Sequence, residues 1–484
     1  MTRTLSTRRL PPPKEPAEKD ADSVPKPAIP NPKPSTKKRR LPLPTTSQPA
    51  KRLKPTSTPL NTPPTTKLHI YVFGDGESGE LGLGPTPING NKPTSVTRPR
   101  LNPLLPASTV GVVQIAAGGM HCITLTHDQN ILTWGVNEDG ALGRDTTWEA
   151  PTRDMDLASN SDDSSSDGDL NPKECTPTAI PREAFGNVSG DFVQVVALDS
   201  ASFALTSTGA VYGWGTFRAS HLANDGILGF TTASSFLSSQ THNPSLLLQR
   251  TPIPIPSLTN IISLAAGNNH ILSLSTTGRF FSWGTPEQSQ LGRRLPRSRF
   301  TALTPAPVAL PPVTKIACGA YHSFAITTDG VVPASLPPPA ENPSAAIIPV
   351  PTPVTALSAH SIRNIAGGEH HSLACTPSGS LLTWDRCDDS QSGIPFPSQI
   401  PVSSKTPTIA LQNLTLDERR RPRSLAPTVV SDFVGEHGGG VVGVAAGIDN
   451  SFAVTSQGAV YAWGFSANYR TGLGREDTLV RPTS

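Results

Sequence analysis

Four histidines occupy the same position of a repeated sequence pattern: His121, His270, His322 and His371. Histidine titrates near neutral pH, so its side chain can act as a general acid or base or can bind a metal ion. A catalytic site needs such a group once, whereas these four recur with the repeat. We therefore interpret them as structural residues that form hydrogen bonds where strands begin.

The sequence also lacks the short motifs of hydrolytic and metal-dependent enzymes. Neither HExxH nor GxSxG occurs, and no metal ligands are clustered. The five cysteines form no CxxC pair: Cys122, Cys175, Cys318, Cys375 and Cys387. This pattern fits a reducing compartment and argues against a structural zinc site. We expect no metal and no cofactor.

The elements that position the histidines are repeats. In residues 112–143 an apolar run ends at Gly118, a second reaches a turn near Gln129, and Trp134-Gly135 leads to Gly-Ala-Leu-Gly. We call the position of Gly118 the anchor. Further anchors are Leu198 (a substituted glycine), Gly267, Gly319, Gly368 and Gly447. Sixteen residues after five of the anchors stand Trp134, Trp214, Trp283, Trp384 and Trp463.

Each repeat predicts short strands joined by a glycine turn, as in the segment around Thr208-Gly209. A closing Gly-x-Leu-Gly marks a tight turn that only glycine tolerates. One such unit cannot bury its faces alone, so the units must stack as a solenoid or a propeller. Four short strands per unit and about fifty residues per repeat favour propeller blades, and we predict an all-β fold.

Residues 1–66 differ in composition from the rest of the chain. Their sixteen prolines and weak apolar periodicity predict a disordered, partly polyproline-like tail. Fourteen Lys or Arg against four Asp or Glu give this tail a charge of +10. The whole chain carries +3, so the remainder, residues 67–484, carries −7.

The tail holds two basic clusters, namely Lys37, Lys38, Arg39 and Arg40, and Lys51, Arg52 and Lys54. Their spacing suits a bipartite nuclear import signal that lays two cationic groups into separate acidic grooves of an importin. The alternative is a basic tail that only keeps the protein soluble. The same charges would bind nucleic-acid phosphates without sequence preference. With no apolar signal core and no run long enough to span a bilayer, we expect a soluble intracellular protein.

Five segments resemble the regulator of chromosome condensation family in its fungal form: YVFGDGESGELGLG, VVQIAAGGMH, WGVNEDGALGRD, WGTFRASHLANDGILGF and LAAGNNHILSL. The resemblance covers roughly residues 68–475. It implies a seven-bladed β-propeller, because six inner halves and a half-blade at 68–84 are recognisable. It also implies a nuclear, chromatin-associated guanine-nucleotide exchange factor for the GTPase Ran, supporting nucleocytoplasmic transport and mitosis. Exchange makes and breaks no covalent bond, because the factor only binds the nucleotide-free GTPase better than the nucleotide-bound form.

The resemblance further implies which residues meet the GTPase. Its binding face uses Glu77, Asp199, Asn269 and His370. Asn269 stands at a normally acidic site, and an amide there carries no charge. A protruding wedge after Trp214-Gly215 includes Phe217, Arg218, Asn224, Asp225 and Gly226. The alternative reading of this wedge is an ordinary blade loop.

Two insertions stand out between the repeats. One carries Arg293, Arg294, Arg297 and Arg299, which by family analogy approach the histones of the nucleosome. The alternative is a solvated loop. The other, residues 158–170, is an acidic serine-rich segment that we interpret as a solvated loop, with phosphorylation as a second possibility.

The repeat pattern is broken at two places. In the fifth repeat Ser335 stands where tryptophan is expected, and a proline-rich segment replaces Trp-Gly and Gly-x-Leu-Gly. We therefore expect the blade around residues 319–345 to lack its outer strands. No seventh inner half follows Gly472-Leu473-Gly474, so the closing blade should also be incomplete.

Three classes of function are compatible with these observations. The first is a Ran exchange factor, which the motifs favour. The second is a chromatin- or protein-binding propeller without exchange activity, which Asn269 and the two breaks favour. The third, a hydrolytic or metal-dependent propeller enzyme, has no motif in its favour.

Overall fold

The computed structural model describes residues 59–87, 90–150, 170–219, 226–228, 248–295, 302–335, 350–396, 414–416, 422–431 and 439–484. Several predicted features lie outside these ranges: both basic clusters of the tail, the acidic serine-rich segment up to residue 169, Asn224, Asp225, Arg297 and Arg299. Within the described ranges, no helix is long and apolar enough to cross a membrane.

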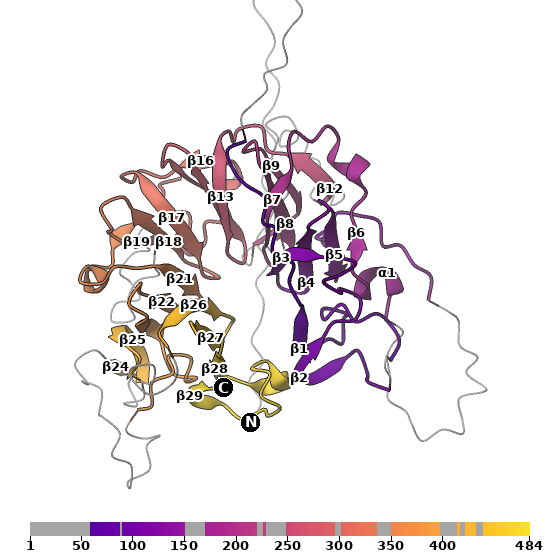
Figure 1. Cartoon of the computed structure of the whole chain (residues 1–484). Helices are drawn as coiled ribbons and strands as arrows, with labels where there is room; N and C mark the ends of the chain where they lie inside the picture. The colour runs from indigo at the N-terminus through magenta and orange to yellow at the C-terminus, as the bar shows by residue number, and fades with distance from the viewer. Residues whose placement is uncertain are drawn as a thin grey trace, which may run out of the picture. The chain divides into compact units, whose positions relative to one another are not determined.

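Antiparallel sheets follow one another along the chain as successive blades (Figure 1). The first sheet consists of β1 (Tyr71–Asp75) and β2 (Ser95–Leu101). The second consists of β3 (Val112–Ala117), β4 (His121–Thr126), β5 (Ile131–Gly135) and β6 (Thr178–Ala179). The third consists of β7 (Phe192–Ala197), β8 (Ala201–Thr206), β9 (Val211–Gly215) and β12 (Gln249–Pro254). The fourth consists of β13 (Ile261–Ala266), β14 (His270–Ser275), β15 (Phe280–Gly284) and β16 (Ala306–Pro307).

The fifth blade consists of β17 (Val313–Cys318), β18 (Ser323–Thr327), β19 (Pro333–Ser335) and β20 (Thr352–Pro353). The sixth consists of β21 (Asn364–Gly367), β22 (His371–Cys375), β23 (Leu381–Arg386), β25 (Pro422–Val429) and β24 (Leu414–Leu416). The seventh consists of β26 (Val441–Ala446), β27 (Asn450–Thr455), β28 (Val460–Gly464) and β29 (Leu479–Thr483). The prediction of an all-β fold is confirmed.

A few short elements lie between the blades. β10 (Phe217–Ala219) and β11 (Gly226–Leu228) form a separate two-stranded hairpin. The helical turns are α1 (Pro172–Cys175), η2 (Arg182–Phe185), η5 (Thr355–Leu357) and η9 (Ala467–Tyr469). Each is at most about one turn long, so the sheets carry the fold.

The glycine turn inside each blade joins its second and third strands. Gly209, Gly278 and Gly379 adopt φ angles of 81°, 74° and 89°, which L-residues rarely take. At the one position that breaks the glycine pattern, Gln129 takes φ 65°. Its side-chain Oε1 then accepts a hydrogen bond from the Phe192 amide of the next blade, which holds the turn in place.

The apolar core lies between neighbouring blades. The tryptophans at the repeat position are at most 2% exposed. Trp214 packs edge-on against Phe185, and Trp283 packs edge-on against Phe203 of the preceding blade. The apolar faces of two blades therefore form one shared layer, which is why a single blade cannot be stable alone.

The seventh blade packs against the first. A Cβ atom built on Gly472 would lie 3.0 Å from the Phe73 ring, and Phe73 lies 6.3 Å from the Phe452 ring. Phe73 stands at the tryptophan position, so this junction uses the same kind of contact as the others. In the described chain β1 pairs with β2 alone, so the first blade consists of outer strands there.

The expectation that the fifth blade lacks its outer strands is wrong. β19 pairs with β18, with Ser323 opposite Ser335, and β20 pairs with β19, with Pro333 opposite Pro353. These two strands are only three and two residues long. Proline has no amide hydrogen to donate, so a proline-rich segment can form no longer ladder.

The folded body begins before residue 67. The amides of Leu60 and Asn61 donate to the Ser207 carbonyl, and the Asn61 side-chain amide donates to the Ile261 carbonyl at 2.9 Å. Asn61 therefore joins the third blade to the fourth, at the end of the blades that holds the glycine turns.

We predict that Gly143→Ala lowers the unfolding free energy more than Gly458→Ala. Both glycines have a positive φ, 66° and 83°, and the turn position of Gly458 accommodates a side chain in the second blade, where Gln129 has φ 65°. A Cβ on Gly143 would lie 2.8 Å from Trp214 Nε1, whereas a Cβ on Gly458 meets nothing within 4 Å. Overpacking of this kind costs about 1–3 kcal/mol. Urea unfolding of the two variants measures the difference, and equal losses would contradict the proposed blade contact.

Candidate partner-binding face

The recurring histidines are buried hydrogen-bonding groups, as their regularity predicted. His121 Nε2 lies 2.8 Å from Ser202 Oγ of the next blade, and His371 Nε2 lies 2.8 Å from Ser451 Oγ. His270 and His322 contact the next blade's serine in the same way. Burial lowers the pKa of His121 and His371 to about 4 and of His270 and His322 to about 3, so all four are neutral at pH 7.

Three of these serines, Ser202, Ser323 and Ser451, in turn donate to the closing loop of the preceding blade. Ser202 Oγ and Trp214 Nε1 both donate to the Ala141 carbonyl, at 3.0 and 2.8 Å. Ser451 Oγ and Trp463 Nε1 both donate to the Gln391 carbonyl, each at 2.9 Å. One loop carbonyl therefore receives two buried donors from the next blade, and we call it the acceptor carbonyl.

The histidine–serine contact is absent between the third and fourth blades, where all the residues that would form it are replaced. The anchor of the third blade is Leu198, the histidine position holds Ala201, and the serine position of the fourth blade holds Ile271. At other anchors a Cβ would clash, since one on Gly267 would lie 2.2 Å from His270 Cε1. Where alanine replaces the histidine, that space is free for a leucine side chain.

The anchor turns form the inner rim of one face. The Asp199 amide donates to the Asn268 carbonyl at 2.8 Å, and the Asn268 amide donates to the Ala320 carbonyl at 3.0 Å. The Glu369 amide donates in the same way to the Ile448 carbonyl of the seventh blade at 3.2 Å. These bonds hold the turn tips of successive blades at fixed distances from one another.

The loops that follow Trp-Gly lie at the same end of each sheet, because His121 pairs with Gly135 and Asn450 with Gly464. We call the anchor turns and these loops together the acidic face. Its carboxylates are Asp75, Glu77, Glu80, Glu138, Asp139, Asp199, Glu287, Glu369, Asp388, Asp389 and Asp449. Outside the β10–β11 hairpin, the described part of this face carries two arginines, Arg386 and Arg470. Much of the negative charge of residues 67–484 is therefore gathered at one end of the blades.

All four residues predicted for the GTPase-binding face lie in these loops. Glu77 is exposed, its amide bonded to Asp75 Oδ1 at 3.1 Å. Asp199 is half-buried above Gly119, where its carboxylate leaves no room for a Cβ. The Asn269 carbonyl accepts from the Thr285 amide at 2.8 Å, and the exposed His370 ring lies 5.6 Å from Tyr321.

The predicted wedge begins at a buried residue on the same face. Phe217 is fully buried and lies 6.3 Å from the Phe203 ring. From there Arg218 pairs with Ile227, and Ala219 with Gly226, in the β10–β11 ladder. The hairpin is thus anchored at its base and continues into residues 220–225, which lie outside the described ranges.

The predicted histone-contacting arginines differ in their surroundings. Arg293 donates to the Ser282 hydroxyl and to the Ala302 and Thr304 carbonyls, and burial lowers the pKa of its guanidinium. It therefore holds its own loop together, as Arg144 does through the Thr133 carbonyl at 2.8 Å. Arg294, in contrast, is exposed.

The structure adds residues that the sequence reasoning missed. Asp385 stands in the place of the glycine of Trp-Gly and takes φ 71°. Beside it Arg386 bonds Asp388 at 2.6 Å and Asp389 at 3.3 Å. The pKa of Arg386 is raised, most strongly by the hydrogen bond to Asp388. The letters Trp-Asp-Arg, where four other repeats read Trp-Gly, are the signal that could have revealed this cluster.

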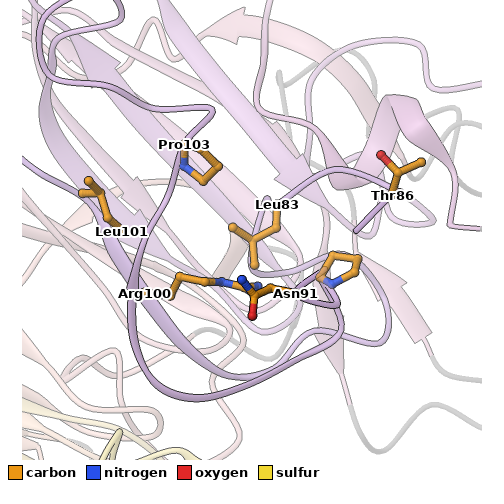
Figure 2. A pocket seen from close by; sticks show the side chains of 7 residues that line it. Leu83, Thr86, Asn91, Arg100, Leu101 and Pro103 are labelled. Atoms are coloured by element: carbon orange, nitrogen blue, oxygen red, sulfur yellow. The ribbon is translucent and has the colours of Figure 1, made fainter. Parts of the chain in front are cut away.

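A cavity of about 220 Å³ lies away from these residues, beside the first blade. Leu83, Pro93 and Pro103 supply its apolar wall. In Figure 2 the Arg100 side chain extends toward Asn91. The cavity contains no predicted site residue. Among the described residues, no group of three or more His, Cys, Asp or Glu could hold a metal ion.

Stacked four-stranded blades with one acidic face define a propeller whose candidate site is a charged binding surface. The RCC1-like domain family matches residues 69–484, and the chain belongs to this family. Its similarity to protein pim1 of Schizosaccharomyces pombe is 36% identity over 435 residues, which covers 86% of this chain and 71% of pim1. The guanine nucleotide exchange factor SRM1 of Saccharomyces cerevisiae is 37% identical over 430 residues, covering 86% of this chain and 82% of SRM1.

The crystal structure of Prp20p from Saccharomyces cerevisiae matches with a TM-score of 0.69 at 35% identity, covering 86% of both chains. That structure was described together with the binding properties of Prp20p to Gsp1p and histones. Yeast Prp20 bound to Kap60 also matches with a TM-score of 0.69, at 34% identity, covering 91% of this chain and 90% of Prp20. The predicted β-propeller of regulator-of-chromosome-condensation repeats is confirmed.

We predict that replacing one histidine–serine pair flattens the pH dependence of stability. The pKa of His121 is about 4 in the folded protein, against 6.5 for an unperturbed histidine. The unfolded chain therefore takes up more protons as pH falls from 6.5 to 4, and the free energy of unfolding falls across this window. The double variant H121A/S202I copies the natural Ala201/Ile271 pair and removes one such contribution. Thermal unfolding at pH 7.5 and 5.0 measures the effect, with the exposed His127→Ala as the control.

Proposed function

We propose that this protein is a guanine-nucleotide exchange factor for the small nuclear GTPase Ran, and that its acidic face binds the GTPase. The single observation that carries the proposal is this face, where the predicted residues Glu77, Asp199, Asn269 and His370 gather around the rim. Proteins similar in sequence to this chain include SRM1, a guanine nucleotide exchange factor, and Prp20p, which binds Gsp1p. A surface rich in carboxylates suits a basic partner and speeds its association.

Exchange on this face needs only differential binding. A factor that binds the nucleotide-free GTPase more tightly lowers the affinity of the GTPase for its nucleotide by the same factor. The rim bonds between Asp199, Asn268 and Ala320 make the face rigid, so little binding energy is lost in ordering it. The hairpin that starts at the buried Phe217 is the element that enters the phosphate site of the GTPase.

We predict that Asp199→Ala reduces the exchange rate about tenfold without lowering the melting temperature. The substitution removes the carboxylate but leaves the backbone bonds of residue 199 in place. Asp128→Ala is the matched control, because Asp128 is an exposed carboxylate in a glycine-type turn at the other end of the blades. Release of a fluorescent nucleotide from Ran measures the rate.

A variant in which a short glycine–serine turn replaces residues 218–227, with the buried Phe217 left in place, should still bind Ran but release nucleotide slowly. Unchanged exchange in both this variant and Asp199→Ala would show that the face is misassigned.

Nuclear import and chromatin binding complete the proposal. The two basic clusters of the tail would bind an importin and nucleic-acid phosphates, and Arg294, Arg297 and Arg299 would approach nucleosomal histones. The binding of Prp20 to Kap60 and of Prp20p to histones supports these assignments. Arg293 is omitted because its guanidinium is engaged within its own loop. The protein would thus act in the nucleus on chromatin, in nucleocytoplasmic transport and mitosis.

We predict that alanine substitution of both basic clusters, residues 37–40 and 51–54, leaves a fluorescent reporter fusion in the cytoplasm. The substitutions remove from the tail the seven positive charges that would bind in the two acidic grooves of an importin. Alanine substitution of the other seven cationic residues of the tail removes the same charge and tests whether net charge alone matters: Arg3, Arg8, Arg9, Lys14, Lys19, Lys26 and Lys33. Full nuclear accumulation of the cluster variant would refute the import signal.

A second candidate function is a chromatin- or protein-binding propeller without exchange activity. Asn269 favours it, because an amide replaces a carboxylate on the acidic face. The same nucleotide-release assay separates the two, since a scaffold would bind histones but leave the release rate unchanged.

A further inference from the structure

The junction between the fifth and sixth blades has no acceptor carbonyl among the described residues. Trp384 occupies the usual position and is 2% exposed, yet its indole Nε1 has no hydrogen-bond partner in the described chain. At the equivalent junctions, Trp134, Trp214 and Trp463 all donate to a loop carbonyl at 2.8–2.9 Å. The cause is the proline-rich segment of the fifth blade, which has no Gly-x-Leu-Gly loop.

Ser372 is the other donor that this missing carbonyl would receive. Its Oγ lies 3.2 Å from His322 Nε2, as in the other histidine–serine pairs. Its own proton goes to Asp385 Oδ2 at 2.9 Å instead of to a loop carbonyl. A carboxylate of the same blade thus accepts the bond that a backbone group of the preceding blade accepts elsewhere.

Asp385 occupies a backbone position that disfavours it. The equivalent residues Gly135, Gly215 and Gly284 have φ angles of 100°, 94° and 123°, and Asp385 has 71°. Non-glycine residues are strained in this region, although aspartate tolerates it better than most. The Arg386 amide nevertheless donates to the His370 carbonyl at 3.0 Å, as the Thr285 amide does to Asn269 in the fourth blade. The hydrogen bond that the Asp385 side chain accepts from Ser372 therefore offsets the backbone strain at this position.

Three parts of the acidic face meet at this carboxylate. Through Ser372, Asp385 reaches His322, the residue after Tyr321, whose ring lies against His370. Along the chain it precedes Arg386, which pairs with Asp388 and Asp389. The position of this carboxylate therefore affects the positions of the turn tips of the fifth and sixth blades.

We infer that Asp385 is a positioning residue that replaces the missing acceptor carbonyl and holds the Tyr321 and His370 turn tips in place for the GTPase. The role in exchange rests on the proposed function, whereas the structural part does not. Asp385 does not itself face the partner. It acts through Ser372 and His322.

The test compares Asp385→Asn with Asp385→Gly. Asparagine keeps an acceptor oxygen and tolerates the backbone angle, whereas glycine relieves the strain but leaves the Ser372 hydroxyl without its acceptor. We expect Asp385→Gly to melt about 2 °C below the unsubstituted protein at pH 6, and to need a several-fold higher concentration for half-maximal exchange. Asp385→Asn should match the unsubstituted protein in both at pH 6. The control Gly464→Asp should lower the melting temperature, because its Cβ would lie 2.4 Å from the Asp449 carbonyl oxygen. No new hydrogen bond offsets this clash, since Ser451 already donates to the Gln391 carbonyl.

A pH profile supplies a readout that simple packing would not move. Burial raises the pKa of Asp385 to about 7, so the stability it contributes is lost as pH rises from about 4 through 7. The surrounding titratable or charged groups are His322, His370, His371, Arg386, Asp388 and Asp389. These groups are the same in the Asp385→Asn variant, which lacks only the titrating carboxyl. The melting temperature of this variant should therefore change less between pH 6 and 8 than that of the unsubstituted protein.

Each outcome bears on one part of the inference. Equal or higher stability of Asp385→Gly would overturn the role as acceptor. The expected loss of stability with unchanged exchange would overturn the positioning role. If the unsubstituted protein has no exchange activity, the proposed function fails, and the melting series still decides whether Asp385 replaces the carbonyl.

Discussion

Four of the described junctions between blades depend on a tight approach between an aromatic ring and a glycine of the preceding blade's closing loop, at Gly82, Gly143, Gly393 and Gly472. A Cβ on Gly82, Gly143 or Gly393 would lie 2.5–2.8 Å from a tryptophan indole nitrogen. The same loop supplies the carbonyl that accepts the indole N–H. A buried N–H left without an acceptor costs about 1–3 kcal/mol, so the ring is most stable where the loop and its carbonyl are present. Among the described residues, Trp384 is buried without this acceptor.

This constraint explains how the protein tolerates its irregular blades. At the fourth-to-fifth junction Ser335 replaces the tryptophan and donates to the same kind of acceptor, the Gln290 carbonyl, at 3.3 Å. The volume of the lost indole is taken by Pro351, whose Cγ lies 2.9 Å from a Cβ built on Gly292. Ser335 thus keeps a hydrogen-bond donor at the tryptophan position, and Pro351 fills the space of the ring. The fifth blade therefore remains a four-stranded sheet despite its short outer strands.

The acidic face follows from the same contacts. Hydrogen-bonded pairs such as His371 and Ser451 fix the strands just behind the anchor turns. The turn residues themselves are then free to be charged, because they need only their backbone groups to hold the rim. Carboxylates can therefore gather there: burial raises the pKa of Asp389 and Asp449, which face Asp388 nearby. Crowded like charges of this kind favour a cationic partner.

The sequence by itself determined the repeat, the strand hairpins and the chemical roles at each repeat position. Period, turn glycines and tryptophans are local signals, so the all-β fold and the structural histidines could be predicted from them. Residues of the acidic face such as Asp199 and His370 were implied by the resemblance to the family and not by these signals. The tertiary structure decided what depends on the neighbouring blade. It showed that β19 and β20 complete the fifth blade, that Arg293 serves its own loop, and that Asp385 accepts from Ser372. No local pattern carries this information, because the partner of each buried donor lies on another blade, roughly fifty or more residues away in a propeller of this repeat length.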